Sequence, residues 1–252
     1  MKLNLKPSWF KVECLWFKNT SCKIKLSTLN LKLLNICLTL RLMDTKEHIM
    51  QVSMLLFSEK GFETTTMRDI ASKADVNLAL INYHFGSKEG LLKNIFQQRA
   101  LNIQFHIWEI ANNKSIDELE KIHQIIEHYV AKMFTNQEFH KVMLRELFSS
   151  EREEVHADTI AIFSENANII IEIIKQGIKK KIFNKVDPEL CFATIIGTIH
   201  HLMLSKLLRE NIYGGKEKKD PILDPSFQKR VTNHIKQIIE NHLIPPLKIK
   251  SI

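Results

Sequence analysis

The chain has 252 residues, of which 44% are hydrophobic and 25% are charged, and its formal net charge is +8. This length and composition can bury a sizeable core, which excludes a disordered or fibrous protein and predicts one small and one larger domain. Residues 1–43 hold eight Lys or Arg and one acid, Glu13, whereas the remainder is nearly balanced. Bulk charge therefore does not by itself indicate a nucleic-acid partner.

Residues 1–42 differ in character from the rest of the chain. They mix lysines with Leu, Ile, Asn, Cys and aromatic residues, without a clean helical or strand period. The apolar run 31–40 is interrupted by Lys32 and Asn35, is too short to span a bilayer and lacks a following cleavage site, which disfavours a signal peptide. We interpret the segment as an atypical extension, which translation from Met43 would omit; a loose tail and a cationic membrane-surface segment are the alternatives.

From Asp44 onward the hydrophobic pattern is helical. No proline occurs between Pro7 and Pro188, and no glycine occurs between Gly90 and Gly177. Strands and hairpins would need such interruptions, so we predict an all-α fold. Helices are expected over residues 44–60, 67–74, 78–85, 91–110, 115–133, 137–148, 153–181, 188–209 and 225–243.

Polar residues mark the starts of several of these helices. Ser115 and Glu118 have the spacing of a capping box. Asp187 is an expected N-cap before a proline at the first helical position, and Asp224 repeats that signal. We therefore expect helices to start at these three points, with a loop around Gly214 before the last one.

The stretch from Thr64 to Leu92 predicts a helix, a tight turn and a second helix. Thr66 and Asp69 have capping-box spacing at the start of the first helix. Residues 75–77, Asp-Val-Asn, supply the turn, because Asx residues tolerate the left-handed backbone that a sharp turn needs. Ser87 is the expected N-cap of the helix that follows the pair.

The second helix of the pair has a core face and a display face. At about 100° per residue, Leu78, Ile81 and Phe85 fall on one side. The opposite side displays a phenol and an imidazole with a carboxamide on its flank, which suits phosphate contact and base reading in a major groove. The residues expected to contact DNA are Thr65, Thr66, Arg68, Asn77, Leu78, Ala79, Leu80, Asn82, Tyr83, His84 and Lys88.

Residues 49–92, with LFSEKGFETTTMRDIASKADVNLALINYHFGSKEGLL at their heart, resemble the DNA-binding domain of TetR/AcrR-family transcriptional regulators. The resemblance is carried by the phenylalanine-glycine boundary at 57–62, the DIA triplet at 69–71 and the HFGSKE run at 84–89. It implies a homodimer, a helical ligand-binding domain and usually repression. The domains expected on this basis are the atypical extension at 1–42, the helix-turn-helix domain at 43–92 and an effector-binding and dimerisation domain at 93–252.

Two positions depart from the family pattern. Asp75 stands where family members usually have glycine, which costs a modest backbone strain but preserves the turn. The start of the second helix is unusually apolar, at residues 78–80. We therefore expect bases to be read through apolar contacts with thymine methyl groups and through Arg68 and Asn82. Phosphates are expected to be bound by Thr66, Tyr83, His84 and Lys88.

The last two helices are the expected dimer surface, because each carries an apolar stripe and the first adds a small-residue patch. Burial of both stripes inside their own domain is the alternative that periodicity leaves open. The expected interface residues are Phe192, Ala193, Ile196, Gly197, Ile199, Met203, Val231, Ile235, Ile238 and Ile239. An effector pocket in the helical body is expected near Trp108, Phe134, Phe148 and His200, each of which could equally be plain core.

Signals of catalysis and metal binding are missing from the sequence. The four cysteines lack metal-ligand spacing, and the adjacent His200 and His201 point about 100° apart on a helix. No glycine-rich phosphate loop, nucleophile elbow or H-E-x-x-H motif occurs. We therefore expect no enzyme, no cofactor and no metal.

The sequence predicts a cytoplasmic, homodimeric, sequence-specific DNA-binding transcriptional regulator. Its expected partners are a double-stranded DNA operator, a second copy of the chain and a small-molecule effector of unknown identity, with no membrane. Release from DNA would follow when the effector favours a dimer conformation that no longer matches the two half-sites. The alternatives are an activator or ligand-independent DNA-binding protein of the same fold, and an all-α enzyme in which the helix-turn-helix is only a packing unit.

Overall fold

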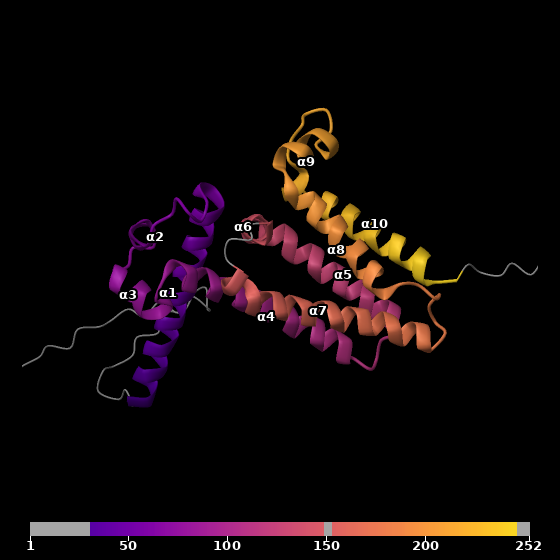
Figure 1. Cartoon of the computed structure of the whole chain (residues 1–252), viewed down its shortest axis with the longest axis horizontal. Helices are drawn as coiled ribbons and strands as arrows, with labels where there is room; N and C mark the ends of the chain where they lie inside the picture. The colour runs from indigo at the N-terminus through magenta and orange to yellow at the C-terminus, as the bar shows by residue number, and fades with distance from the viewer. Residues whose placement is uncertain (1–30, 149–152, 246–252) are drawn as a thin grey trace, which may run out of the picture. The chain divides into compact units, whose positions relative to one another are not determined.

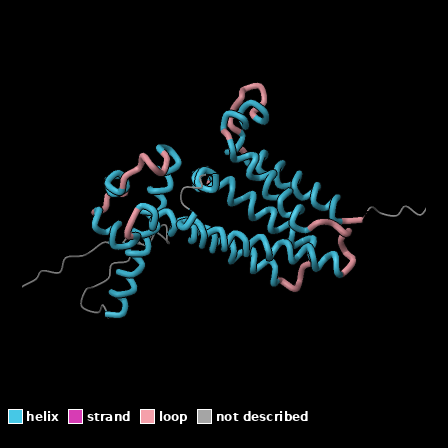
Figure 2. The backbone as a smooth tube through the Cα atoms, viewed as in Figure 1, coloured by secondary structure: helices cyan, strands magenta, loops and turns pink. Residues whose placement is uncertain are grey.

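The computed structural model describes residues 31–148 and 153–245 (Figure 1). Side chains are described from Thr45 onward, except at residues 147–148, 153–156 and 158. The regular elements in these ranges are ten α-helices and one short 3-10 helix (Figure 2), which confirms the predicted all-α fold. The chain divides into two units, Met1–His48 and Ile49–Ile252.

Helix α1 spans Leu31–Lys60 and begins earlier than the sequence pattern predicted. Residues 31–42 lack a helical period, but they are rich in leucine and contain no glycine or proline, so their intrinsic propensity favours a helix without an amphipathic face. The part of the predicted extension at residues 1–30 lies outside the described residues. At the other end, Gly61 has a φ of +92° and its N–H donates to the Phe57 carbonyl at 3.0 Å, which ends the helix as predicted.

The next three helices lie where the sequence placed them. Helix α2 spans Met67–Lys73, α3 spans Leu78–Phe85 and α4 spans Lys88–Asn112. Ile70 of α2, Ile81 of α3 and Leu91 of α4 are completely buried, and α2 and α4 both pack on α3. This shared core holds α3 rigidly between its neighbours.

The remaining helices form a bundle around the long α4. Helix α7, Glu153–Lys179, packs along α4, while α5, Glu118–Thr135, packs against both α7 and α10 (Figure 1). Helix α10 spans Pro225–Leu243, and α8 spans Pro188–Leu204. Helix α6 covers Gln137–Phe148, as predicted, and packs on α8.

The start of α5 corrects the predicted capping box at Ser115 and Glu118. The N-cap is Asp117, whose side chain accepts a hydrogen bond from the Glu120 backbone N–H at 2.8 Å. Ser115 instead donates its hydroxyl and its backbone N–H to the side chain of Asn113. Serine and aspartate are comparable N-caps, but the Ser115 hydroxyl is bonded to Asn113, so Asp117 caps the helix and the helix starts later.

The end of α8 corrects the prediction of one helix up to residue 209. The helix ends at Leu204, where Ser205 takes an extended backbone and caps a separate helix α9, Lys206–Tyr213, by accepting from the Leu208 N–H. The two helices are bent by 99°. Among the described residues, no single helix has the length and apolar composition to cross a membrane, whereas the bent pair α8–α9 meets that test by length and composition only.

Candidate nucleic-acid interface and interior cavity

The turn between α2 and α3 is built by side chains that satisfy the free helix ends. Thr66 accepts from the Asp69 N–H at 3.1 Å, and the Asp69 carboxylate accepts from the Thr66 N–H at 2.9 Å, which completes the predicted capping box. Hydrogen bonds from the Thr66 side chain and then its backbone hold the pKa of Asp69 below its usual value. Asp75 has a φ of +53°, as the turn prediction required. Asn77 caps α3 by accepting from the Ala79 N–H at 2.8 Å.

Helix α3 presents one face to solvent. Ile81 and Phe85 are buried on the other face, which confirms the predicted core side. Tyr83 is 83% exposed, and Asn82 and Ala79 are also exposed. A buried face under a largely exposed one gives α3 the geometry of a helix that can enter a major groove.

The other predicted contact residues vary in exposure. Arg68 and Thr66 are exposed on or beside α2, whereas Leu78, Leu80 and His84 are half-buried. Leu78 packs against the core beside Ile81, so only part of it faces outward. The Nε2 atom of His84 is buried without a hydrogen-bond partner.

Thr65 does not lie on this surface, which corrects its predicted role. Its side chain is completely buried, and the hydroxyl donates to the Gly61 carbonyl at 2.8 Å. The residue therefore ties the end of α1 to the start of α2. The three threonines look equivalent in sequence, but Thr64 and Thr66 are exposed whereas Thr65 is buried.

Lys88 has a structural contact that the sequence did not predict. Its ammonium donates to the carbonyl oxygens of Phe62 at 2.9 Å and Glu63 at 3.3 Å. The same nitrogen lies 4.3 Å from the centre of the Phe62 ring. Lys88 thus links the first turn of α4, capped by Ser87, to the loop between α1 and α2. Its predicted phosphate contact stays a prediction.

The four predicted pocket residues are not brought together. Phe134 is buried against Phe227, with ring centres 5.9 Å apart, whereas Trp108 is 57% exposed on α4. The Phe148 side chain lies outside the described residues. Only His200 lines the apolar cavity between α4, α5, α6, α7 and α8.

This interior cavity has a volume of about 330 Å³ and an apolar, partly aromatic wall. None of the described residues that line it is Lys, Arg, Asp or Glu. The aromatic side chains in its wall are Tyr129, Phe139, His140, Phe163, Phe192 and His200. The sequence did not single out the first four of these and assigned Phe192 to the dimer surface, because periodicity marks an inward face without distinguishing a packed core from a cavity wall.

The titratable groups of the interior cavity are uncharged near neutral pH. Burial, assisted by the neighbouring His200, lowers the pKa of His140 to about 3, against the opposing effect of a hydrogen bond to the Lys132 carbonyl. Burial also lowers the pKa of His200 and raises that of the Tyr129 hydroxyl. The described part of the cavity wall therefore offers neutral donors and acceptors.

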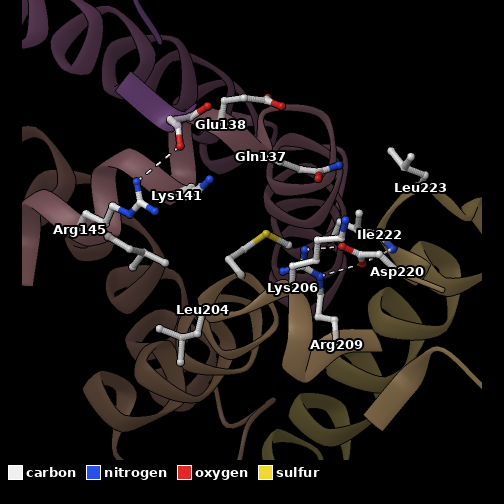
Figure 3. A pocket seen from close by; sticks show the side chains of 13 residues that line it. Gln137, Glu138, Lys141, Arg145, Leu204, Lys206, Arg209, Asp220, Ile222 and Leu223 are labelled. Carbon is white, nitrogen blue, oxygen red and sulfur yellow. Dashed lines mark hydrogen bonds and ion pairs between the residues drawn. The ribbon is translucent and has the colours of Figure 1, made fainter. Parts of the chain in front are cut away.

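A second hollow, of about 480 Å³, is lined by other residues of α6, by α9 and by the segment before α10 (Figure 3). Its wall includes Lys141, Arg145 and Lys206, charged side chains of a kind that the described wall of the interior cavity lacks. Arg145 donates to the Ser58 carbonyl at 3.5 Å, which joins α6 to the last turn of α1. Helix α6 thus contributes to the interior cavity, to this hollow and to a contact with the first helix.

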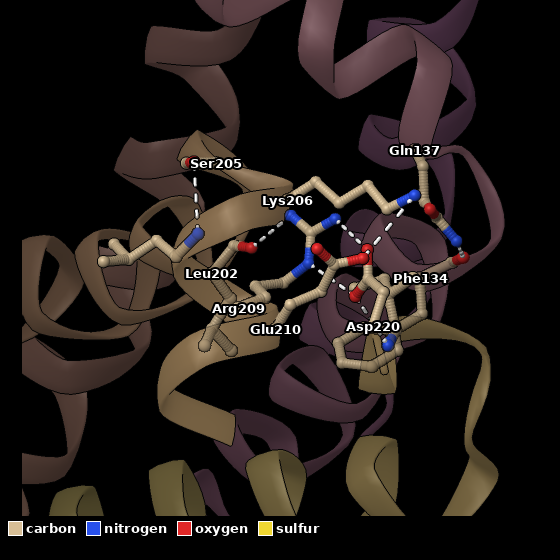
Figure 4. A network of polar contacts seen from close by, with 10 residues as sticks. Phe134, Gln137, Leu202, Ser205, Lys206, Arg209, Glu210 and Asp220 are labelled. Carbon is tan, nitrogen blue, oxygen red and sulfur yellow. Dashed lines mark hydrogen bonds and ion pairs between the residues drawn. The ribbon is translucent and has the colours of Figure 1, made fainter. Parts of the chain in front are cut away.

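A buried ion pair holds α9 beside this hollow (Figure 4). Arg209 donates from Nε and Nη2 to Asp220, at 3.0 and 2.7 Å, and from Nη1 to the Leu202 carbonyl at 2.8 Å. Burial raises the pKa of Asp220, but hydrogen bonds from Arg209 and Ile222 outweigh it and leave the pKa below its usual value. The network explains why the chain turns sharply after α8.

The predicted dimer residues fall into two groups. Five are buried in the core of their own chain and cannot form a surface, which corrects that part of the prediction; they are Ile199, Met203, Val231, Ile235 and Ile239. Phe192 and Ile196 line the interior cavity. Ala193, Gly197 and Ile238 are exposed, so their predicted role stays open. The apolar stripes belong to the core because α8 and α10 bury them against each other and against α5.

The described residues offer little for metal or nucleophilic chemistry. They contain no group of three or more His, Cys, Asp or Glu side chains placed to hold a metal ion. Cys191 is buried, and burial followed by the nearby Asp187 raises the pKa of its thiol. A protonated, enclosed thiol is a poor nucleophile.

Two family models match the chain. The model of bacterial regulatory proteins of the tetR family matches residues 49–95, which include α2 and α3. The model of the tetracyclin repressor-like C-terminal domain matches residues 115–204, which include α5 to α8. Both matches fall on the elements that carry the exposed reading face and the interior cavity.

Individual proteins are similar over shorter stretches. The probable HTH-type transcriptional regulator YttP of Bacillus subtilis is 42% identical over 55 residues, 22% of this chain and 27% of that protein. IcaR, the negative transcriptional regulator of the biofilm operon icaADBC in Staphylococcus aureus, is 35% identical over 96 residues, 34% of this chain and 50% of that protein. The chain thus spans half or less of the length of these curated relatives.

One solved structure extends the similarity over most of the fold. The transcriptional regulator FadR from Bacillus subtilis, in complex with stearoyl-CoA, superposes with a TM-score of 0.61. It is 20% identical and covers 77% of this chain and 96% of that chain. At this identity the similarity establishes the fold.

Proposed function

Because the chain belongs to the TetR/AcrR family of transcriptional regulators, we propose that it acts as a homodimeric repressor that a small molecule releases from its operator. The observation that carries this proposal is the exposed face of α3, where Tyr83 and Asn82 project from a helix whose other side is buried. We assign DNA reading to residues 43–92, and effector binding and dimerisation to residues 93–252. Repression is supported by the similarity to IcaR, which is a negative transcriptional regulator.

Dimerisation is proposed through the exposed sides of α8 and α10. Leu190 of α8 is 65% exposed, and Ala193 and Gly197 lie one and two turns further along the same helix. Small residues allow a second helix to approach closely, and Ile238 of α10 adds an exposed apolar side chain. Two copies joined in this way would present two α3 helices to two half-sites of one operator.

Effector response is proposed through the interior cavity. Met143 and His140 of α6 line it, and Arg145 of the same helix contacts the Ser58 carbonyl at the end of α1. A ligand that moves α6 would therefore disturb the contact that joins the helical body to the reading domain. That FadR was solved with stearoyl-CoA supports small-molecule binding in this fold. An activator of the same fold is the second candidate.

A nuclease footprint on DNA that flanks the protein's own gene tests DNA reading. We expect one protected, two-fold-symmetric site that is lost in Tyr83→Ala. Trp108→Ala is the matched control, because it removes another exposed aromatic side chain far along α4 from the turn. The wild type, Tyr83→Ala and Trp108→Ala could instead all give equal, salt-sensitive protection without a discrete site. That result would refute sequence-specific reading at this locus.

Sedimentation equilibrium tests the dimer. Gly197→Arg places a long cation on the exposed face of α8, where a Cβ would meet no neighbouring atom of the same chain. We expect a folded monomer with no footprint, whereas Asn102→Arg on the exposed side of α4 should remain dimeric. A dimer that persists in Gly197→Arg would place the interface elsewhere. Transcription in vitro, measured with and without the protein, distinguishes a repressor from an activator. Removing a repressor raises transcription, whereas removing an activator lowers it.

A further inference from the structure

The second hollow, between α6, α9 and the segment before α10, carries more positive than negative charge. Among the described residues that line it, four are cationic and two are acidic: Lys141, Arg145, Lys206 and Arg209 against Glu138 and Asp220. We propose that this hollow binds an organic phosphate monoester, whose head group lies against Lys141 and Arg145 and whose apolar body lies against the end of α8. The site is separate from the interior cavity, and it does not depend on the proposed response to an effector.

Two of the four cations have acidic partners. Arg209 donates from Nε and Nη2 to Asp220 at 3.0 and 2.7 Å, so this pair adds no net charge to the hollow (Figure 4). The Nζ atom of Lys206 lies 3.6 Å from the Glu210 carboxylate, which is too far for a good hydrogen bond but close enough to offset part of the charge. The remaining positive charge of the hollow therefore comes from α6.

Lys141 and Arg145 supply this charge from one face of α6. They are four residues apart, so their side chains leave the helix on the same side, and both are exposed (Figure 3). Lys141 forms no ion pair with a described residue. Arg145 donates to the Ser58 carbonyl at 3.5 Å, and a neutral acceptor leaves the charge of the guanidinium uncompensated. An anion in the hollow would therefore meet two cations that have no carboxylate partner among the described residues.

Much of the remaining wall is apolar. Leu144, Met203 and Ile222 line the hollow and are largely buried, whereas Leu204 and Leu223 are exposed at 55% and 82%. A bare inorganic ion would leave this apolar surface in water, but an organic anion can cover it while its head group stays beside α6. The volume of about 480 Å³ falls within the range of about 300–1,000 Å³ that small-molecule sites occupy.

A phosphate monoester matches the two cations better than a carboxylate does. Its head group has three terminal oxygens and close to two negative charges above pH 7, so it can accept from an ammonium and a guanidinium together. Arginine binds such oxygens through two parallel N–H groups, and lysine binds them as a point charge. A carboxylate would bring a single negative charge to the same two cations.

Equilibrium dialysis of the full chain at pH 8 tests the proposal with three probes. They are 1-naphthyl phosphate, inorganic phosphate, which lacks the apolar body, and 1-naphthol, which lacks the charge. We expect 1-naphthyl phosphate to bind about 10-fold or more tightly than inorganic phosphate, because only the ester covers the apolar wall. Equal binding of these two would mean an ion held by charge alone and would overturn the proposal.

Removing the cations of α6 locates the site. We expect Lys141→Gln to weaken binding of 1-naphthyl phosphate by about 3- to 5-fold, the upper part of what an exposed charge contributes. The double variant Lys141→Gln/Arg145→Gln should weaken it by about 10-fold or more, whereas the affinity for 1-naphthol should be the same in all three proteins. An unchanged affinity for the ester, or an equal loss for the ester and for 1-naphthol, would contradict the assignment.

Removing an acid from the same face gives a result that a folding defect cannot imitate. Glu138 lies one turn before Lys141 and repels an anion, so Glu138→Gln should tighten binding of 1-naphthyl phosphate by about 2- to 5-fold. Lys229→Gln, on the exposed side of α10, and Arg68→Gln, on α2, remove one cation each outside the hollow and should leave the affinity unchanged. A gain absent in Glu138→Gln, or a loss in Arg68→Gln as large as in Lys141→Gln, would place the ester elsewhere. Dialysis without DNA reports on this site alone, so its failure would leave the proposed DNA reading intact.

Discussion

Replacing Lys88 with Met distinguishes a structural role from a phosphate contact. The substitution keeps most of the aliphatic stem but removes the ammonium that donates to the Phe62 and Glu63 carbonyls. Hydrogen bonds from a charged donor contribute roughly 1.5–3 kcal/mol, and the half-buried site reduces that figure. A cation at the start of a helix interacts unfavourably with the helix dipole, so its removal adds back about 0.3–1 kcal/mol to the free energy of unfolding. We therefore expect Lys88→Met to lower the free energy of unfolding by about 1–2 kcal/mol.

Two measurements separate the roles of Lys88. Urea unfolding followed by circular dichroism gives the change in stability, with Lys229→Met on the exposed side of α10 as the control. The slope of log K for operator binding against log salt gives the number of phosphate contacts, because each contact contributes a slope of about −0.9. The carbonyl contacts predict a loss of stability with an unchanged slope. Unchanged stability with a slope reduced by about one would refute this assignment.

Three further substitutions test the fold. Asp75→Gly should stabilise the turn by up to about 1 kcal/mol in urea unfolding, because it relieves the left-handed backbone at a φ of +53°. Gly177→Ala should lower the melting temperature, since its Cβ would collide with the Phe183 ring; overpacking typically costs about 1–3 kcal/mol. Arg209→Met should lower the free energy of unfolding by about 3 kcal/mol, because it leaves the Asp220 carboxylate without its partner. The double variant Arg209→Met/Asp220→Leu should lower the free energy of unfolding by less than the sum of the two single changes.

The reading domain was predictable because its determinants are local. Thr66 and Asp69 satisfy each other's backbone groups within one turn, and Asp75 and Asn77 shape the bend from their own side chains. Such interactions depend on spacing alone, so the sequence is sufficient to place α2 and α3. Thr65 was misplaced because its hydroxyl binds the Gly61 carbonyl, and nothing in the threonine run distinguishes a tether from a contact residue.

The helical body was less predictable because its decisive contacts join distant segments. The sequence from Pro188 to Arg209 supports one helix, yet the chain bends at Ser205, where Arg209 gains Asp220 and the Leu202 carbonyl as partners. The apolar stripes of α8 and α10 satisfy the same periodicity whether they face a partner or their own core, and only packing against α5 decides between them. The same argument applies to His140. A histidine beside Phe139 on an amphipathic helix looks like core, and only the five helices together place it in the wall of a cavity. The cavity wall therefore depends on tertiary packing among distant segments, whereas the DNA-reading element is specified one turn at a time.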